Sequence, residues 1–257
     1  MGLGFKDRFK IELQRRVDWI VFPFTALYAT IWLQLVNRYR ISNLKEVRKK
    51  FRLLESKSSG PLLICGNHLT LVDTIIKEWA LLSKFRYVTK FSLFPWSLPE
   101  KKNFSHNWFW RIAAYLGKCI YIVRQGPPEE TKLVLEKVKY LLERGEAVSI
   151  FPEGHRSRIG RVDTENFAYG TGKILQSVEK PRVLCVFLRG KNQQHYSDFP
   201  ARGEDFYIDI EMIFPQSPHR GLRADRDLAT QVIQKLAEME QRFFETVRPD
   251  WQEDRAL

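Results

Sequence analysis

Residues 61–83, PLLICGNHLTLVDTIIKEWALLS, combine a short apolar run, a polar loop and a longer apolar stretch. Leu62 to Cys65 follows the loop dipeptide Gly60-Pro61 and predicts a buried strand. Asp73 to Ser83 predicts a helix that begins where the polar loop ends. A strand, a loop and a helix in this order form the repeating unit of an α/β fold.

The same alternation continues along the rest of the chain. Strands are predicted at Tyr87 to Lys90, Ile120 to Val123, Ala147 to Phe151, Val183 to Leu188 and Tyr207 to Ile213, and helices at Asn43 to Ser59, Pro128 to Gly145 and Asp225 to Val247. The order predicts an α/β domain with a mixed, largely parallel sheet flanked by helices. Functional side chains are expected at the carboxyl ends of the strands.

The composition is basic and aromatic. The 257 residues carry a net charge of +12 and include 18 Phe, 7 Trp and 9 Tyr, a combination typical of proteins that meet anionic membranes or anionic substrates. Charge alone leaves nucleic acid open, but the sequence has no zinc-finger spacing, RNP-like motif or long basic recognition helix, so no nucleic-acid partner is expected. Cys65, Cys119 and Cys185 lie in apolar runs without CxxC spacing, which indicates reduced, buried thiols.

Residues Trp19 to Val36 contain no charged side chain and are just long enough to span a membrane. Pro23 interrupts this run, and basic residues flank both of its ends. Since the positive-inside rule then favours the cytosol for both ends, a monotopic or re-entrant anchor is preferred over a crossing helix. A crossing helix and a buried core helix remain open. We expect the protein at the cytosolic face of a membrane, which in a bacterium is the cytoplasmic membrane.

His68 follows the first predicted strand, and Asp73 stands five residues later. A carboxylate at this spacing could accept a hydrogen bond from one ring nitrogen and leave the other free to act as a general base. In the alternative interpretation, Asp73 only caps its helix and His68 is a polar loop residue. Two metal ligands are a third interpretation, but no further His, Cys or carboxylate completes a site, so no metal is expected.

Two more segments follow strand-like runs. Glu153-Gly154-His155-Arg156-Ser157-Arg158 combines a glycine, which lets the backbone approach a ligand, with guanidinium groups that match phosphate oxygens. Gly117 to Arg124 ends in an arginine that could reach the same pocket. Either segment could instead be a solvated basic surface.

Taken together, the segments resemble the successive motifs of the glycerolipid acyltransferase family, whose best-known members are the lysophosphatidate acyltransferases. The matching residues are Asn67-His68-x4-Asp73, Gly117 to Arg124 and Phe151-Pro152-Glu153-Gly154-x-Arg156-Ser157, and the resemblance covers about residues 45 to 215. It implies an N-terminal membrane-associating helical segment, residues 1–44, and an acyltransferase catalytic domain, residues 45–257.

The resemblance also implies roles for single residues. His68 would act as general base and Asp73 would support it, while the acceptor hydroxyl of lysophosphatidate attacks the thioester of acyl-CoA or acyl carrier protein to form phosphatidate. The acceptor phosphate would bind at Arg124 and Arg156, in a pocket shaped by Glu153, Gly154 and Ser157. The implied partners are a membrane lipid, the acyl donor and a phosphorylated lysolipid, with no cofactor.

Some residues depart from the family pattern. His155 replaces a small hydroxyl residue, and Cys185 stands where a fourth motif usually has proline. The acceptor therefore stays open to another lysophospholipid, glycerol phosphate or a hydroxylated lipid-like molecule. The stretch Phe91 to Trp110 is unusually aromatic and could line an acyl tunnel, touch lipid or pack in the core, which is the default. A basic membrane- or nucleic-acid-binding protein without catalysis is the competing class.

Overall fold

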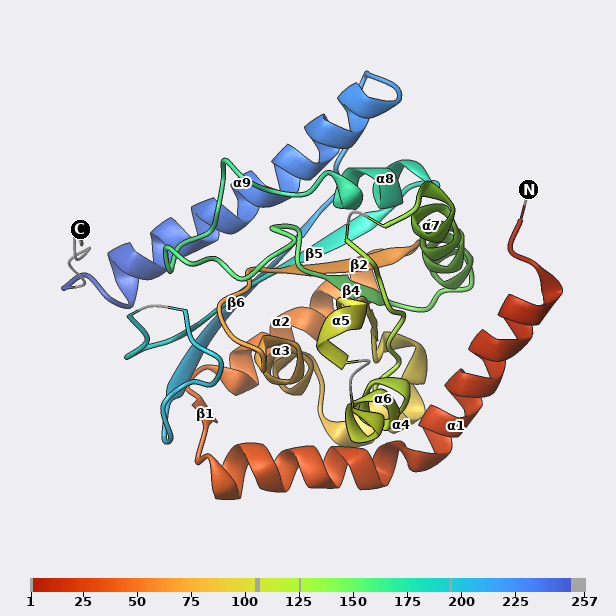
Figure 1. The fold of residues 1–257 in the computed structure, drawn as a ribbon. Coiled ribbons are helices and arrows are strands. Elements are labelled where there is room, and N and C mark those ends of the chain that lie inside the picture. The colour runs from red at the N-terminus through yellow and green to blue at the C-terminus, as the bar shows by residue number, and fades with distance from the viewer. Residues whose placement is uncertain (1, 105–106, 125, 195, 251–257) are drawn as a thin grey trace.

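The computed structural model describes residues 2–104, 107–124, 126–194 and 196–250, so the end of the predicted catalytic domain at 251–257 lies outside it. A six-stranded sheet lies between layers of helices (Figure 1). Its strands are ordered β1 (Arg40–Ile41), β6 (Asp205–Ile213), β5 (Arg182–Gly190), β2 (Leu62–Gly66), β4 (Val148–Ile150) and β3 (Trp96–Ser97). Only β5 and β6 pair antiparallel; the other neighbours are parallel. The predicted mixed, largely parallel α/β sheet is confirmed.

Strand β5 joins the two halves of the core. All nine of its residues are buried, and alternate side chains point to opposite faces of the sheet. Leu184, Val186 and Leu188 belong to one apolar cluster, whereas Val183, Cys185 and Phe187 belong to the other. Because both of its faces are covered, the middle of this strand, Val183 to Leu188, is continuously apolar instead of alternating with polar residues.

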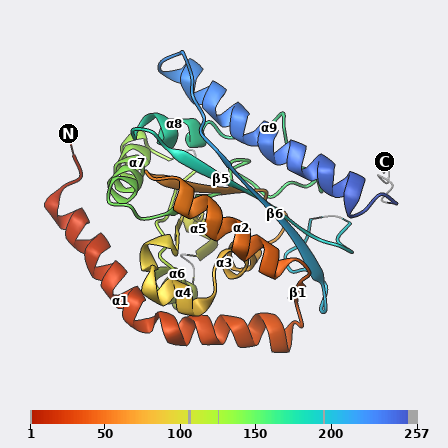
Figure 2. The same cartoon turned by 180° about the vertical axis from the view of Figure 1, so that it is seen from behind.

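Each face of the sheet has its own helices. The first apolar cluster is covered by α2 (Leu44–Lys57), α3 (Asp73–Leu81) and α4 (Lys84–Thr89), and the second by α7 (Pro128–Glu143), α8 (Gly170–Gln176) and α9 (Leu222–Thr246). Figure 2 shows the same two layers from behind. The remaining short elements are η2 (Phe91–Leu93), α5 (Lys101–Phe104) and α6 (Trp108–Tyr115).

The N-terminal segment is helical, as predicted. Helix α1 (Phe5–Thr30) continues into a π-helical stretch, η1 (Ile31–Val36), and the two run along the edge of the molecule (Figure 1). By length and composition, Phe5–Val36 is the one helix in the described part of the chain that could cross a membrane. Its inner face is packed on the body of the protein: Ile11 is buried in the second apolar cluster, and Phe22 and Leu33 in the first.

Two predicted strands are wrong. Tyr87 to Lys90 lies in and beside α4, because the Ser83 hydroxyl caps a helix by accepting a hydrogen bond from the Arg86 N–H and Tyr87 turns inward to the Glu78 carbonyl. Within Ile120 to Val123, only Ile122 forms a bridge, an isolated one to Glu100 in the segment after β3. Pro99 in that segment has no N–H, so a continuous ladder cannot form.

The three cysteines are free, as predicted. Cys65 and Cys185 are paired neighbours on β2 and β5 and are fully buried, whereas Cys119 is half-buried. Burial raises the pKa of the Cys65 thiol to about 12, so this thiol stays protonated and inert.

Candidate active site

Asn67 guides the chain out of the sheet at the carboxyl end of β2. Its side-chain nitrogen donates to the Leu188 carbonyl at 3.0 Å, and its side-chain oxygen accepts from the Leu188 N–H at 2.8 Å. The amide group therefore continues the pairing of β2 with β5 for one more position. The next residue, His68, is free to turn away from the sheet.

Asp73, the first residue of α3, organises the His68 loop. Its Oδ2 lies 3.1 Å from His68 Nδ1 and accepts from the N–H groups of Leu69 at 2.6 Å and Thr70 at 2.7 Å. Its Oδ1 accepts from the Thr70 hydroxyl. The carboxylate is buried, so these donors replace the water it has lost. An acceptor at Nδ1 selects the imidazole tautomer whose Nε2 carries a lone pair for a proton.

The His68 ring is also held from its face. It stacks on Phe151, the residue after β4, with ring centroids 3.9 Å apart and planes inclined by 10°. Since stacking fixes the plane and Asp73 fixes the rotation within it, the ring has little freedom left. The structure thus brings two of the sequence segments, around His68 and after β4, into direct contact.

Glu153 and Ser157 secure the His68 backbone. Glu153 Oε1 accepts from the His68 N–H at 2.9 Å, its Oε2 accepts from the Asp163 N–H at 3.3 Å, and the Ser157 N–H donates to the His68 carbonyl at 2.9 Å. Both side chains are buried. Burial raises the pKa of Glu153 to about 8, although the two N–H donors work in the opposite direction. These contacts make them residues that position His68.

Gly154 stands between the positioning residues and the basic part of the loop. Its φ of +75° is a left-handed conformation, and an added Cβ would lie 3.0 Å from the Ala168 methyl group. Glycine is therefore required for the turn that returns the chain toward His68.

The two arginines predicted to bind phosphate are each paired with a carboxylate. Arg156 binds Asp198 through Nη1, and Arg124 Nε lies 2.9 Å from Glu100 Oε2. Residues 197 and 198 also bond to the backbone of Leu69 and Leu71, which places the Arg156 pair beside the His68 loop. For Arg124, no contact with His68 or Arg156 is found among the described residues.

Like the two arginines, His155 is paired with a carboxylate. Its Nε2 lies 3.3 Å from Asp163 Oδ2, and the side chain is partly exposed. It is thus held on the outer side of the loop whose inner side carries Glu153.

Lys77 is a residue that the sequence interpretation missed. It is fully buried one helical turn after Asp73, with Nζ 2.6 Å from Ser149 Oγ and 4.4 Å from the centroid of the Phe151 ring that supports His68. Burial lowers the pKa of its ammonium group. Its position in the buried stripe of α3, next to Ile76 and one turn before Ala80 and Leu81, was a signal available in the sequence.

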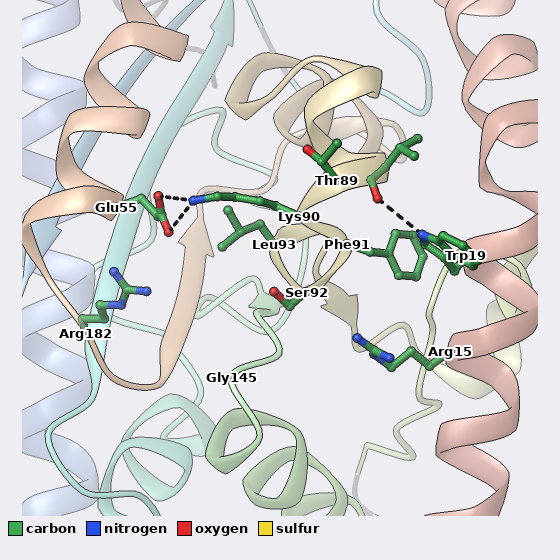
Figure 3. Close-up of a pocket in the computed structure, with 11 residues that line it drawn as sticks. Arg15, Trp19, Glu55, Thr89, Lys90, Phe91, Ser92, Leu93, Gly145 and Arg182 are labelled. Carbon is green, nitrogen blue, oxygen red and sulfur yellow. Dashed lines mark hydrogen bonds and ion pairs between the residues drawn. The ribbon is translucent and has the colours of Figure 1, made fainter.

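A cavity of about 580 Å³ lies elsewhere, between α1, α2 and α4 (Figure 3). Gly145, before β4, and Arg182, the first residue of β5, line it, so it opens at the amino ends of the strands. His68 follows the opposite, carboxyl end of β2. The cations that line the cavity already have partners within the protein: Lys90 pairs with Glu55, Arg15 pairs with Glu146, and Arg182 donates to the Ser58 and Gly60 carbonyls. The cavity is therefore separate from the candidate active site.

No group of three or more His, Cys, Asp or Glu side chains is close enough to hold a metal ion within the described ranges. The arrangement around His68 offers proton transfer: a buried carboxylate, an oriented imidazole and an open ring nitrogen.

Comparison with known proteins agrees with this chemistry. The sequence model of the acyltransferase family matches residues 38–189, more than half of the chain and somewhat nearer the N-terminus than the expected 45 to 215. No match is found among curated proteins. The matched region contains His68, Asp73, Arg124 and the loop from Glu153 to Ser157. The chain belongs to the acyltransferase family, the family of the glycerolipid and lysophosphatidate acyltransferases.

Proposed function

We propose that this protein is a membrane-associated O-acyltransferase that moves a fatty acyl group from acyl-CoA or acyl carrier protein to the hydroxyl of lysophosphatidate. The observation that carries the proposal is the 3.1 Å contact between His68 Nδ1 and a buried Asp73 carboxylate that also holds the backbone of the same loop. An imidazole fixed in this way presents one basic nitrogen in one direction.

In the proposed reaction, His68 Nε2 takes the proton from the acceptor hydroxyl as its oxygen attacks the thioester carbonyl. The tetrahedral intermediate then collapses, the carbon–sulfur bond breaks, and the thiolate leaves and is protonated. The products are phosphatidate and a free thiol, and no acyl-enzyme is formed. Because a thiolate is a good leaving group, a strong second acid is not required.

Arg156 is proposed to receive the acceptor phosphate. Its present partner, Asp198, has two thirds of its side chain exposed. An exposed carboxylate can turn into water when a phosphate, which offers more oxygen acceptors, approaches the guanidinium. Arg124 is proposed as a second phosphate ligand; since its partner Glu100 is buried and cannot turn into water, the half-exposed arginine side chain itself would have to move toward the phosphate.

Helix α1 is proposed to rest in the membrane interface. While its inner side chains Ile11, Phe22 and Leu33 are packed on the body, Trp19, Ile20 and Phe24 on other faces are exposed. The basic residues on both sides of the uncharged run favour the cytosolic leaflet.

The decisive experiment measures free thiol released from acyl-CoA in detergent micelles containing lysophosphatidate. His68→Ala should abolish acceptor-dependent thiol release, because the variant lacks the proposed proton acceptor. His219→Ala is the matched control, since His219 is an exposed histidine in the loop before α9. Equal thiol release by His68→Ala and the wild type would overturn the catalytic role.

A panel of acceptors identifies the substrate. Lysophosphatidate, another lysophospholipid, glycerol phosphate and a hydroxylated lipid without phosphate are supplied in turn, each with acyl-CoA and with acyl carrier protein, and the products are identified by mass spectrometry. Phosphatidate as the main product is the expected result. Preference for a phosphate-free acceptor would contradict the role of Arg156.

A further inference from the structure

Helix α6 exposes an apolar surface that nothing in the described chain covers. Of its eight residues, Trp108 to Tyr115, only Ala114 is buried. Trp108 is 72% exposed, Phe109 51% and Trp110 44%, and Ile112 and Tyr115 are also exposed. Core packing, the default expectation for these aromatics, is therefore wrong for this helix.

A helix that is apolar on most sides and still exposed requires a partner outside the chain. Eight residues extend only about 12 Å, well short of the roughly 30 Å apolar thickness of a bilayer. Helix α6 can therefore lie within one interface of a membrane but cannot cross it. Tryptophan and tyrosine are the side chains that favour this depth.

The position of α6 relative to α1 supports a lipid partner. Gln14 of α1 donates to the Tyr115 carbonyl at the end of α6 with 2.8 Å between nitrogen and oxygen, and Trp19 Nε1 lies 3.3 Å from the Val88 carbonyl of α4. Phe85 on α4 is 76% exposed. Figures 1 and 2 both show α4 and α6 beside the middle of α1.

The charges around α6 select anionic lipid over another protein's apolar surface. Five exposed cations lie on α6 and on the neighbouring helices α4 and α5, and in the described part of the chain none of them forms an ion pair: Lys84, Arg86, Lys101, Lys102 and Arg111. Unpaired cations beside an inserted aromatic cluster match lipid phosphates, each adding about 1 kcal/mol of attraction to an anionic surface.

We propose that this α6 surface, made of Trp108, Phe109, Trp110 and Ile112 with Phe85 of α4, inserts into the interface of an anionic membrane as a second contact beside α1. The proposal rests on the proposed membrane-bound function. It gives the protein two separate points of attachment, which hold the body in one orientation on the lipid surface.

Insertion is tested with the full chain and vesicles of phosphatidylcholine and phosphatidylglycerol, without substrate. Trp108→Ser/Phe109→Ser should weaken binding, so that the lipid concentration that binds half of the protein rises about tenfold or more. This is the effect expected when two aromatic side chains lose their apolar burial. Phe214→Ser/Leu222→Ser is the matched control, because Phe214, directly after β6, and Leu222, the first residue of α9, are both exposed. Circular dichroism verifies that each variant is folded.

A fluorescent label reads the insertion directly. Trp108→Cys in a Cys119→Ala background takes an environment-sensitive dye, because Cys65 and Cys185 are fully buried. Its emission should shift to the blue with vesicles and be quenched by spin-labelled lipid, whereas a dye at Phe214→Cys should not respond.

The charges have their own control. Lys101→Gln/Lys102→Gln/Arg111→Gln should lose about fivefold in affinity per charge for anionic vesicles. Arg220→Gln/Arg223→Gln/Arg226→Gln, which removes the same charge from the α9 end, should lose little.

Three results would overturn the proposal. The dye at position 108 could show no change in emission on vesicles that still bind the protein, or the aromatic variant and its control could bind equally well. A blue shift that depends on protein concentration without lipid would instead indicate contact with a second copy of the chain. These measurements use no acyl donor, so a failure of the proposed acyl transfer would leave them unaffected.

Discussion

The proposed base and the proposed phosphate-binding arginines of this acyltransferase are held in opposite ways. The hydrogen bonds and ring stacking around His68 come from groups within the protein, chiefly buried Asp73 and Phe151. Arg156 and Arg124 are partly exposed, and each is paired with a carboxylate that a bound phosphate would have to replace. One region is complete before substrate arrives, whereas the other must exchange a partner.

This difference separates catalysis from recognition. A pre-organised base needs no rearrangement during the reaction, so its contribution belongs to the chemical step. If an ion pair must open for the ligand, the free energy of breaking that pair weakens the affinity for the ligand. Variants at the two regions should therefore change different kinetic constants.

After the loss of His68 itself, the largest effect is expected from Asp73→Asn. The amide cannot accept from all of its present donors or stabilise a protonated imidazole, and kcat should fall on the order of 10³–10⁴-fold, as for other neutralised carboxylates beside a catalytic histidine. The KM for the acceptor should change little. Thr70→Val, which removes only the hydroxyl donor to Asp73, is the milder comparison.

Steady-state thiol release gives both constants, and a thermal unfolding scan confirms that Asp73→Asn is folded. A loss in KM alone, with kcat preserved, would place Asp73 in substrate binding instead of catalysis.

An intermediate effect is expected at Arg156. Arg156→Ala should weaken acceptor binding by about 1.5–3 kcal/mol, or roughly 10- to 150-fold in KM, because a charge-assisted hydrogen bond to phosphate is lost. Asp198→Asn should change KM in the opposite direction, since it removes the carboxylate that competes for the same guanidinium.

The pair is measured by varying the acceptor at saturating acyl donor. If both variants raise KM, the Arg156–Asp198 pair serves to hold the loop and does not open for phosphate.

The smallest effect is a pH dependence of stability at Glu153. Its pKa is raised to about 8, so between the usual glutamate pKa and pH 8 the folded protein holds a proton that the unfolded chain has released. The free energy of unfolding should therefore decrease as pH rises through this range. In Glu153→Gln this contribution is absent.

Urea unfolding of both proteins from pH 5 to pH 9 measures the difference. The stability advantage of the wild type over Glu153→Gln should shrink steadily with pH. A constant difference would mean that Glu153 is already ionised in the folded protein.

The parts of the fold with strong periodicity were predictable from the sequence. The apolar runs of β2 and β5 and the helical patterns of α7 and α9 carry their own signal. The two-residue strands β1 and β3 do not, because they are defined by pairing with β6 and β4. Helix α4 was predicted as a strand because tyrosine, valine and threonine favour strands, whereas capping by Ser83 and burial of Tyr87 determine its conformation.

The contacts of the candidate site also differ in how far they could be predicted from the sequence. The His68 and Asp73 contact follows from a local spacing of five residues, so sequence could suggest it. The partners of Arg124 and Arg156 are 24 and 42 residues away, and only the folded chain brings Glu100 and Asp198 to them. Long-range pairing of charges leaves no pattern in a single sequence.

Asn67 limits how the motif around His68 can vary. Its one side chain must offer a donor and an acceptor to the same peptide unit of β5, and both atoms are used. Serine is too short to span this pair of contacts, and ionised aspartate would oppose the Leu188 carbonyl with negative charge. The side chain before His68 therefore serves alignment: it ties the loop that carries the histidine to β5, a strand in which all nine residues are buried.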